Sequence, residues 1–583
     1  MKKYILICAI AFLAFACNDL FDKTNLESMG SDIVWKDPQL IEAYVNNLYA
    51  NHPSWTRVES DCSDESRNGY RTHPAWKIIK GEWGVDDNPL GWWSAYTYIR
   101  KCNDIIKNIE NAPIDINLKN RIKGEAHYFR ATAYFYLAVR YGGVPIITEP
   151  QEFNSPDLRP GRKSIPETFE FVSSEFAKSA ELLVNFKTYD SKNFGRVTWG
   201  AAKSMEARTY LFWASPLYNI ENKTDLWEKS AKLSSEVITS GTYTLNKNVR
   251  NLFLDHSSSE NIFAIYYKMP ERQHGLDAWA KPVTIANGDA AHWGPLQELV
   301  DAFPTINGLS IDQDQTYDPA NPYLNRDPRL QAFICVNGSQ YCGRTQYNYM
   351  DIGTVDPSFP AEELMRFKSW DVKGGEQFDA AGSPHNSLTG YIYRKGIKED
   401  LAINAYSYGN GSETPFIEIR LAEVILNLAE ALNEMGESEL ACNELFKIRD
   451  RAGILSPEVP AKNRQSKEAL RKFIQNERYI ELCFEHKRYW DLRRWKLAES
   501  LLGGRKFKGA KILLNLLENA DILASQAYKT GSFTQQLDML RKTWTYQTYE
   551  VDEAPYVFEA KMYFMPIPRS ELETNPNLNN PGW

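Results

Sequence analysis

Apolar residues recur every three or four positions along much of the first half of the chain. Near residue 130, for example, Ile122, Ala126 and Phe129 share one face of a 3.6-residue period, which is the pattern of an amphipathic helix. The letters VPII at 144–147 predict a short strand after this helix. The same apolar spacing predicts helices over 36–53, 92–111, 118–141, 166–187, 198–218 and 224–240.

A second helical region begins at Ile417. A stripe of apolar residues runs from Leu421 to Leu432, Gly436 interrupts it, and another stripe continues to Ala452. Such helix–turn–helix pairs resemble tetratricopeptide units, which bury their faces only by stacking on one another. Because insertions separate the pairs, we expect no regular solenoid.

The segment 257–412 between these regions is rich in Gly, Pro, Asn, Asp and aromatic residues and shows little periodicity. A long irregular segment inside a compact protein usually carries function or irregular sheet. The sequence therefore predicts a mainly α fold, in which helix pairs form the scaffold and a loop-rich lobe with little β structure lies against them.

The first residues have the composition of an export signal. Lys2 and Lys3 precede an apolar run that is too short to span a bilayer, and Ala16 stands directly before Cys17. Bacterial lipoproteins are cleaved before such a cysteine, which is then acylated. We therefore expect a signal peptide over 1–16, a lipid on Cys17 that holds the protein in the outer membrane, and a tether over 17–31; a plain signal whose cleavage site precedes a cysteine is the alternative.

Composition narrows the range of partners. The formal net charge is −8, which argues against nucleic acid or an anionic lipid face as the main partner. No CxxC pair and no HExxH motif occurs in the sequence, so no metal site and no cofactor is predicted. Cys335 and Cys342 bracket a short polar loop, and their pairing is left open. Sixteen Trp residues point to flat apolar surfaces that are exposed to solvent.

Six segments resemble the SusD/RagB family of outer-membrane glycan-binding lipoproteins, and they occur in that family's order. They are YFRATAYFYLAVRYGGVPII (128–147), TWGAAKSMEARTYLFWASPLYN (198–219), IRLAEVILNLAEALNEMG (419–436), RDRAGI (449–454), ERYIELCFEHKRYWDLRRW (477–495) and FMPIPRSELETNPNLNNPGW (564–583). The resemblance implies one domain on four tetratricopeptide-like helix pairs. It also implies a partner, a SusC-like TonB-dependent transporter over which the lipoprotein sits as a lid.

We divide the chain accordingly. A helical N-terminal region covers 32–256 and a C-terminal region covers 257–583. The second region consists of the irregular lobe 257–412, helical pairs over 413–500 and a C-terminal segment over 501–583 that wraps the fold and contains a short strand at PIP (566–568).

One helix contains a carboxylate series that could suggest a glycosidase. Glu477, Glu481 and Glu485 follow one another at i, i+4 and i+8 and share one face. Arg residues crowd the same segment, however, and guanidinium groups favour the ionised carboxylate, whereas a general acid needs a raised pKa. We interpret this as an ion-paired structural helix and predict no enzyme activity.

A glycan site needs flat aromatic side chains for sugar faces and polar side chains for hydroxyls. In the predicted loop 55–93, aromatic and polar side chains of these kinds alternate along the sequence. The family resemblance implies that residues of the central lobe also contribute to the ligand surface. The predicted ligand-binding residues are Trp76, Trp83, Trp293, Arg71, Asp86 and Asn88; for each Trp, local packing is the alternative. A surface glycanase and a peptide-binding lid of a peptide importer are the competing functions, and an exposed aromatic arc would favour sugar over peptide.

Overall fold

The structure is a computed structural model of the chain. It describes residues 31–53, 58–281, 292–337, 339–341, 344–345, 364–366, 387–400, 411–515, 520–530, 539 and 544–583.

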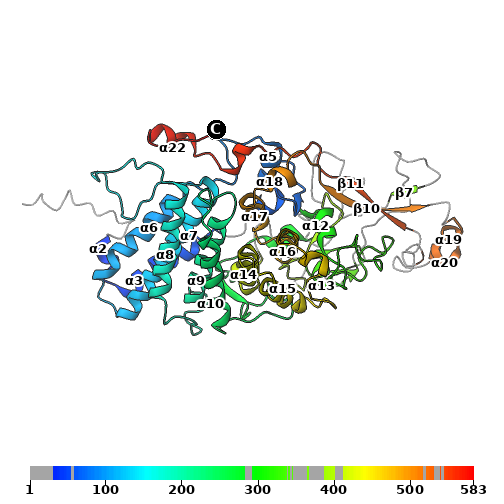
Figure 1. The fold of residues 1–583 in the computed structure, drawn as a ribbon, viewed down its shortest axis with the longest axis horizontal. Helices are drawn as coiled ribbons and strands as arrows, with labels where there is room; N and C mark the ends of the chain where they lie inside the picture. Colours follow the sequence, from blue (N-terminus) through cyan, green and yellow to red (C-terminus); the bar gives the residue numbers. More distant parts are fainter. Residues whose placement is uncertain are drawn as a thin grey trace, which may run out of the picture.

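Helices of the N-terminal region pack side by side in chain order at one end of the molecule (Figure 1). The main ones are α3 (Pro38–Ala50), α6 (Ala95–Asn108), α7 (Ile116–Tyr141), α8 (Ile165–Leu182), α9 (Trp199–Ala214) and α10 (Asp225–Thr239). Each falls on a helix predicted from the apolar spacing. Local signals fix their ends: the Asp115 carboxylate caps α7, Ser164 and Glu167 form a capping box on α8, and such caps satisfy the free N–H groups of a first turn.

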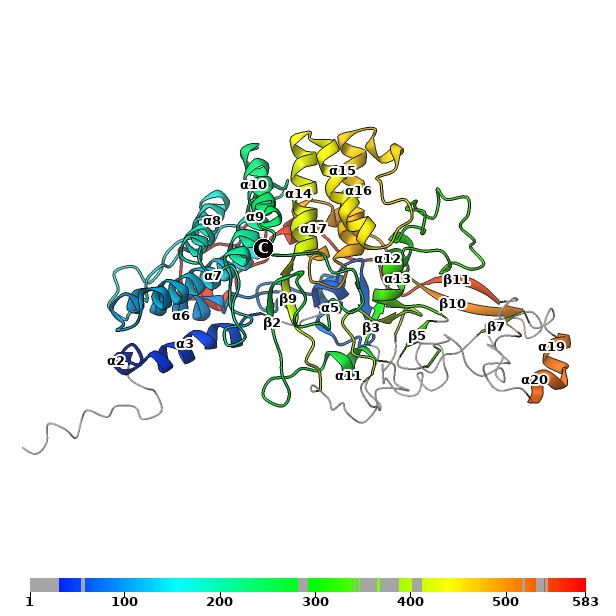
Figure 2. The same cartoon turned by 90° about the horizontal axis from the view of Figure 1, so that it is seen from below.

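Helix α14 packs directly against α10, although residues 240–420 separate the two in sequence, and so it extends the row of helices (Figure 2). Three helices complete this part of the scaffold: α14 (Leu421–Met435), α15 (Ser438–Arg451) and α16 (Lys467–Glu481). The predicted helix start at Ile417 is wrong, since Phe416–Arg420 forms strand β9, which pairs with β2 (Asn261–Ile265). The mainly α fold on packed helix pairs is confirmed.

Short elements make up the rest of the described chain. The short helices are α2 (Ser31–Val34), α4 (Val58–Asp61), α5 (Pro74–Lys80), α11 (Leu276–Ala280), α12 (Gln297–Ala302), α13 (Pro328–Phe333), α17 (Arg488–Arg494), α18 (Ala498–Leu501), α19 (Ala520–Ala524), α20 (Gln526–Thr530) and α22 (Arg569–Thr574), with 3₁₀ turns at Ile109–Asn111, Ala461–Arg464 and Ala560–Tyr563.

The antiparallel strand pairs are small, as expected for an irregular lobe with little β structure. Beside β2 and β9 they involve β1 (Ser66–Asn68) with β3 (Trp293–Pro295), β4 (Ile334–Cys335) with β8 (Ile392–Tyr393), β5 (Gln340–Tyr341) with β6 (Arg344–Thr345), and a sheet in the order β11 (Trp544–Glu550), β10 (Lys508–Asn515), β7 (Leu364–Arg366). The β10–β11 ribbon extends away from the helices in Figures 1 and 2.

Two predicted strands do not form. At 144–147 the backbone bonds to side chains of flanking helices instead: the Ile147 N–H donates to the Tyr134 hydroxyl at 2.7 Å and the Val144 N–H to Thr168 Oγ1 at 3.3 Å. The tail around PIP (566–568) is irregular for a similar reason, since the Ile567 N–H donates to Asn580 Oδ1 at 2.8 Å. The tail does lie across the N-terminal region, as the bond from the Met565 N–H to the Arg140 carbonyl shows.

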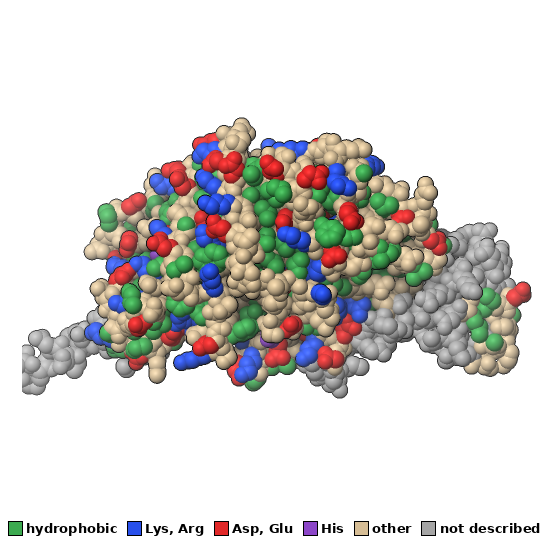
Figure 3. All heavy atoms as spheres, turned by 60° about the horizontal axis from the view of Figure 1, so that its bottom comes forward, with side chains coloured by type: hydrophobic (Ala, Val, Ile, Leu, Met, Phe, Trp, Pro, Cys, Tyr) green, Lys and Arg blue, Asp and Glu red, His purple; other side chains and the backbone are tan. Residues whose placement is uncertain are grey.

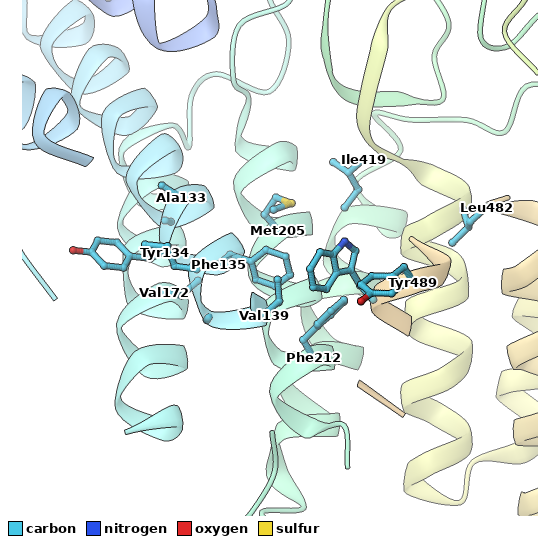
Figure 4. Packing of buried hydrophobic residues seen from close by; sticks show 14 of the residues in the cluster. Ala133, Tyr134, Phe135, Val139, Val172, Met205, Phe212, Ile419, Leu482 and Tyr489 are labelled. Atoms are coloured by element: carbon cyan, nitrogen blue, oxygen red, sulfur yellow. The ribbon is translucent and has the colours of Figure 1, made fainter. Parts of the chain in front are cut away.

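The main core lies between the helices of the row. Figure 4 shows Phe135 and Val139 of α7 pointing toward Phe212 of α9, with the rings of Phe135 and Phe212 at a centroid separation of 5.2 Å. Edge-to-face packing of this kind adds to the apolar area that the rings bury. The helices therefore form a firm scaffold from which the loops of the lobe project.

Acidic and basic side chains are interspersed over the face shown in Figure 3, and neither sign dominates it. No helix in the part of the chain that the structure describes is long and apolar enough to cross a bilayer.

Candidate functional site

Trp76 and Trp293, two of the predicted ligand-binding residues, meet at the β1–β3 pair. Trp293 lies opposite Asn68 in this pair, and the Trp76 Nε1–H donates to the Asn68 carbonyl at 3.1 Å. The Arg71 guanidinium covers the Trp76 ring at 4.1 Å from its centre. The loop and the central lobe thus meet at this strand pair, but Trp76 and Trp293 are each only 4% exposed.

Trp83, Asp86 and Asn88 lie apart from this pair, and Trp83 and Asp86 contact residues of the C-terminal tail. Trp83 is 7% exposed and packs against Trp583, with ring centroids 4.8 Å apart. The Asp86 carboxylate is paired with Arg569 at 2.7 Å, and the Asn88 side chain caps a local turn by accepting the Leu90 N–H at 3.1 Å.

The prediction that Trp76, Trp83 and Trp293 form an exposed platform is therefore corrected: all three are core residues. The physical reason is that the loop is covered by segments remote in sequence, including Trp583 and the strands of the central lobe. Cys17 and Cys342 lie outside the described residues, so the lipid anchor stays a prediction and the pairing of Cys335 with Cys342 stays open.

The carboxylates Glu477, Glu481 and Glu485 are ion-paired, as the sequence predicted, but they do not share one helix face, because α16 ends at Glu481 and Glu485 lies in the turn that follows. Glu481 bonds to Arg420 and Arg329 at 2.8 Å each, and Glu477 bonds to Arg329 at 2.7 Å. The neighbouring arginines and Lys395 hold the pKa of Glu481 well below its usual range despite its burial, and Arg420 with Lys395 lowers the pKa of Glu485 to about 2. Groups that stay ionised to such low pH are unsuited to protonating a leaving group.

An inner cavity of about 320 Å³ lies between α7, α9 and α17, and Trp92 of the 55–93 loop is one of the residues that line it. Its walls are aromatic, but its charged groups are paired with one another. Arg208 bonds to Glu423 at 2.7 Å and Arg478 to Asp491 at 3.0 Å. The first pair joins the two helical regions, the second joins α16 to α17, and both leave little charge directed at a ligand.

Three neighbouring aromatic rings beside β2 are open to solvent in part: Phe194 is exposed, and Tyr266 and His256 are partly buried. Phe194 is 51% exposed, its ring centre lies 4.7 Å from that of Tyr266, and Tyr266 lies 5.6 Å from half-buried His256. We call Phe194, Tyr266 and His256 the aromatic row. Exposed, neighbouring ring faces of this kind are what the apolar face of a sugar stacks on.

Local structure explains why Phe194 stands where it does. The Asp190 carboxylate accepts the Asn193 N–H at 3.0 Å and so closes a turn. Gly195 follows with a φ of +84°, and a Cβ there would lie 3.0 Å from the Tyr266 ring. Glycine tolerates both the left-handed backbone and the close contact with the Tyr266 ring. The turn at Gly195 therefore lets the Phe194 ring pack against the Tyr266 ring.

The aromatic row connects two depressions. One, of about 290 Å³, is lined by Phe194, Tyr266, Arg272 and residues of α3, and the other, of about 560 Å³, is lined by His256 with several charged side chains. Burial raises the pKa of Tyr266 to about 12, so its hydroxyl stays protonated and can both donate and accept a hydrogen bond. Together the row and the depressions are sized for a short oligosaccharide.

Sequence reasoning missed all three residues of the aromatic row. The only available signal was the polar, Gly-containing segment DSKNFGR around Phe194, which reads as an exposed turn with one unexplained aromatic residue. Nothing in the sequence connects it to Tyr266 or His256.

A stack of helix pairs with a loop-rich lobe and an exposed aromatic row defines a class of helical-repeat binding proteins. Two family models match the chain: one described as the SusD family over residues 259–583, and one described as starch-binding associating with outer membrane over residues 20–211. The chain belongs to the SusD family.

Curated relatives match over nearly their whole length. A SusD-like protein of Bacteroides ovatus is 23% identical over 100% of this chain and 98% of its own. SusD-like protein P2 of Formosa agariphila is 24% identical over 86% of this chain and 92% of its own.

Solved structures share the fold. A SusD-like protein from Bacteroides fragilis has a TM-score of 0.75 at 24% identity, covering 96% of this chain and 100% of its own. A SusD-like carbohydrate-binding protein from the same organism has a TM-score of 0.72 at 26% identity, covering 94% and 100%. A laminarin-binding SusD-like protein has a TM-score of 0.61 at 18% identity, covering 94% and 100%.

Proposed function

We propose that this protein is a cell-surface lipoprotein that captures oligosaccharide or polysaccharide and delivers it to a partner SusC-like TonB-dependent transporter of the outer membrane. The observation that carries the proposal is the exposed aromatic row in a member of the SusD family. Two similar proteins are described as carbohydrate-binding and laminarin-binding, and one matching family model is described as starch-binding and associated with the outer membrane.

In this mechanism the protein binds and releases without chemistry. Sugar rings stack on Phe194 and Tyr266, and side chains of the two depressions bond to hydroxyl groups. Each stack contributes about 0.5–1.5 kcal/mol, taking aromatic pairs as the guide, so two or three stacks with a few exposed hydrogen bonds give a dissociation constant of roughly micromolar to millimolar. Such weak binding suits a protein that hands its ligand on.

An open row favours sugar over peptide. A lid for a peptide importer would hold an extended backbone in a closed polar cavity and satisfy its N–H and C=O groups. The row instead lies on the surface between two open depressions, where little of a peptide backbone would be enclosed.

Affinity electrophoresis in gels containing starch, laminarin or polygalacturonate tests the proposal. At least one polysaccharide should retard the protein, and Phe194→Ala should weaken binding about two- to tenfold, the loss expected of one stack. Phe153→Ala is the matched control, because Phe153 is fully exposed on another loop. The site assignment fails if Phe194→Ala migrates like wild type, and the function itself fails if no polysaccharide retards the protein.

Delivery is tested separately. The protein, purified with an affinity tag from solubilised outer membranes, should bring a TonB-dependent transporter with it in a stoichiometric complex. Recovery of the protein alone under mild detergent would contradict the role as a transporter lid.

A further inference from the structure

The smaller depression at the end of the aromatic row is unusually basic for an acidic protein. Among the residues that the structure describes, its lining includes Lys192, Arg196 and Arg272 and no carboxylate, although the chain as a whole carries a formal net charge of −8. A local excess of one sign in a hollow concentrates ligands of the opposite sign.

The three cations are not equivalent. The Arg196 guanidinium is neutralised within the protein, because it forms ion pairs with Glu42 at 2.7 Å and with Glu125 at 3.2 Å. Lys192 is exposed, and neither Lys192 nor Arg272 forms an ion pair with any residue that the structure describes. Two cations therefore remain for a ligand.

Arg272 is held in place for such a role. One of its terminal N–H groups donates to the Ala50 carbonyl at 3.1 Å, and the guanidinium lies 4.8 Å from the centre of the Tyr267 ring. A guanidinium has five N–H donors, so most of them stay available. A group that is positioned before binding loses less entropy when the ligand arrives.

The balance of donors and acceptors points to one ligand chemistry. A neutral sugar offers hydroxyl groups that both donate and accept, and it is matched by side chains of both kinds. Here Lys192 and Arg272 only donate, the Tyr266 hydroxyl can donate as well as accept, and the Asn46 side-chain oxygen already accepts from Arg196 at 3.0 Å, so donors outnumber free acceptors. The lining therefore matches a ligand rich in acceptors, which on a sugar means a carboxylate or a sulfate.

We propose that this depression binds an anionic sugar residue, with Arg272 and Lys192 on its carboxylate or sulfate and the sugar ring on Phe194 and Tyr266. The inference rests on the proposed function and adds the class of glycan. Neighbouring sugar units then continue along the aromatic row toward His256 and the larger depression.

The test is calorimetric titration of the full-length mature protein with three oligosaccharides of similar length: oligogalacturonides for the carboxylate, carrageenan oligosaccharides for the sulfate and laminari-oligosaccharides as the neutral probe. One anionic probe should bind more tightly than the neutral one, and its affinity should fall as salt is raised. The anionic probe that binds identifies the charged group.

Variants separate charge from stacking. Arg272→Gln should weaken anionic binding about tenfold or more, as expected for a lost charge-assisted hydrogen bond. Lys192→Gln should weaken it severalfold, and because Lys192 is exposed this variant stays informative if Arg272→Gln fails to fold. Lys232→Gln, which removes an exposed cation on α10, is the matched control and should bind like wild type.

The outcomes distinguish the two proposals. If only the neutral oligosaccharide binds and Phe194→Ala weakens it, the glycan-binding function stands and the anionic assignment is overturned. If Arg272→Gln and Lys192→Gln bind the anionic probe like wild type, the assignment is likewise overturned. If no oligosaccharide of any class binds, both proposals fall.

Discussion

Trp76→Ala tests whether the tryptophans of the 55–93 loop hold the fold or hold the ligand. The Trp76 ring is 4% exposed, its Nε1–H donates to the Asn68 carbonyl at 3.1 Å, and Arg71 covers it. Truncating a buried Trp costs about 3–5 kcal/mol, and leaving a buried carbonyl unpaired adds about 1 kcal/mol. We expect the free energy of unfolding to fall by about 4–6 kcal/mol, a large share of the roughly 5–15 kcal/mol of a typical domain.

The assay is urea unfolding followed by far-ultraviolet circular dichroism. Trp76→Phe is the matched variant, because it keeps most of the apolar volume and loses the N–H, so its cost should be about 1–2 kcal/mol. Phe153→Ala should stay within about 0.5 kcal/mol of wild type, as exposed positions do. The reasoning is refuted if Trp76→Ala unfolds at the same urea concentration as wild type and has lost glycan binding, since the ring would then be an exposed ligand contact.

Three further predictions concern anchoring, acid stability and catalysis. Cys17→Ala should release a folded protein into the soluble fraction, because stable attachment needs more than one acyl chain; sedimentation with outer membranes of a strain lacking the transporter would contradict the lipid anchor. The pKa of Glu485 is lowered from 4.5 to about 2 in the fold, so its stabilising contribution is present above about pH 4.5 and is lost as the pH falls toward about 2; urea midpoints measured across this range should decline in wild type, and less steeply in Glu485→Gln. Incubation with a bound glycan should create no new reducing ends, and turnover that disappears in Glu481→Gln would show that the α16 carboxylates are catalytic.

The sequence was sufficient for the scaffold because apolar periodicity records burial directly. The helices predicted over 118–141 and 224–240 correspond to α7 and α10, with ends set by nearby caps and glycines. The helix predicted from Ile417 is wrong because strand β9 runs directly into helix α14 in FIEIRLAEVIL with no Gly or Pro between them, and the short β9 segment is recognised as a strand only once β2 is known to pair with it.

The candidate site was only partly predictable, since exposure in a loop depends on what covers it. In the sequence, Trp83 stands among polar residues, as a solvent-exposed ligand-binding Trp would. In the fold, the Trp583 ring packs against it. Conversely, Phe194 and Tyr266 come from separate loops whose approach depends on the turn at Gly195. Contacts between residues so far apart in sequence leave no periodic signal.

The coverage of the 55–93 loop by the end of the chain bears on the order in which the protein folds. The Val557 N–H donates to the Ile79 carbonyl at 2.8 Å, and Trp583, packed on Trp83, also donates from Nε1 to the Phe564 carbonyl at 3.0 Å. The loop cannot be buried until these residues have been synthesised, so its tryptophans stay exposed to solvent during most of translation. Such non-local closure slows folding and exposes apolar surface in the meantime. A tag or truncation at Trp583 should therefore affect the yield of folded protein more than one placed before α3.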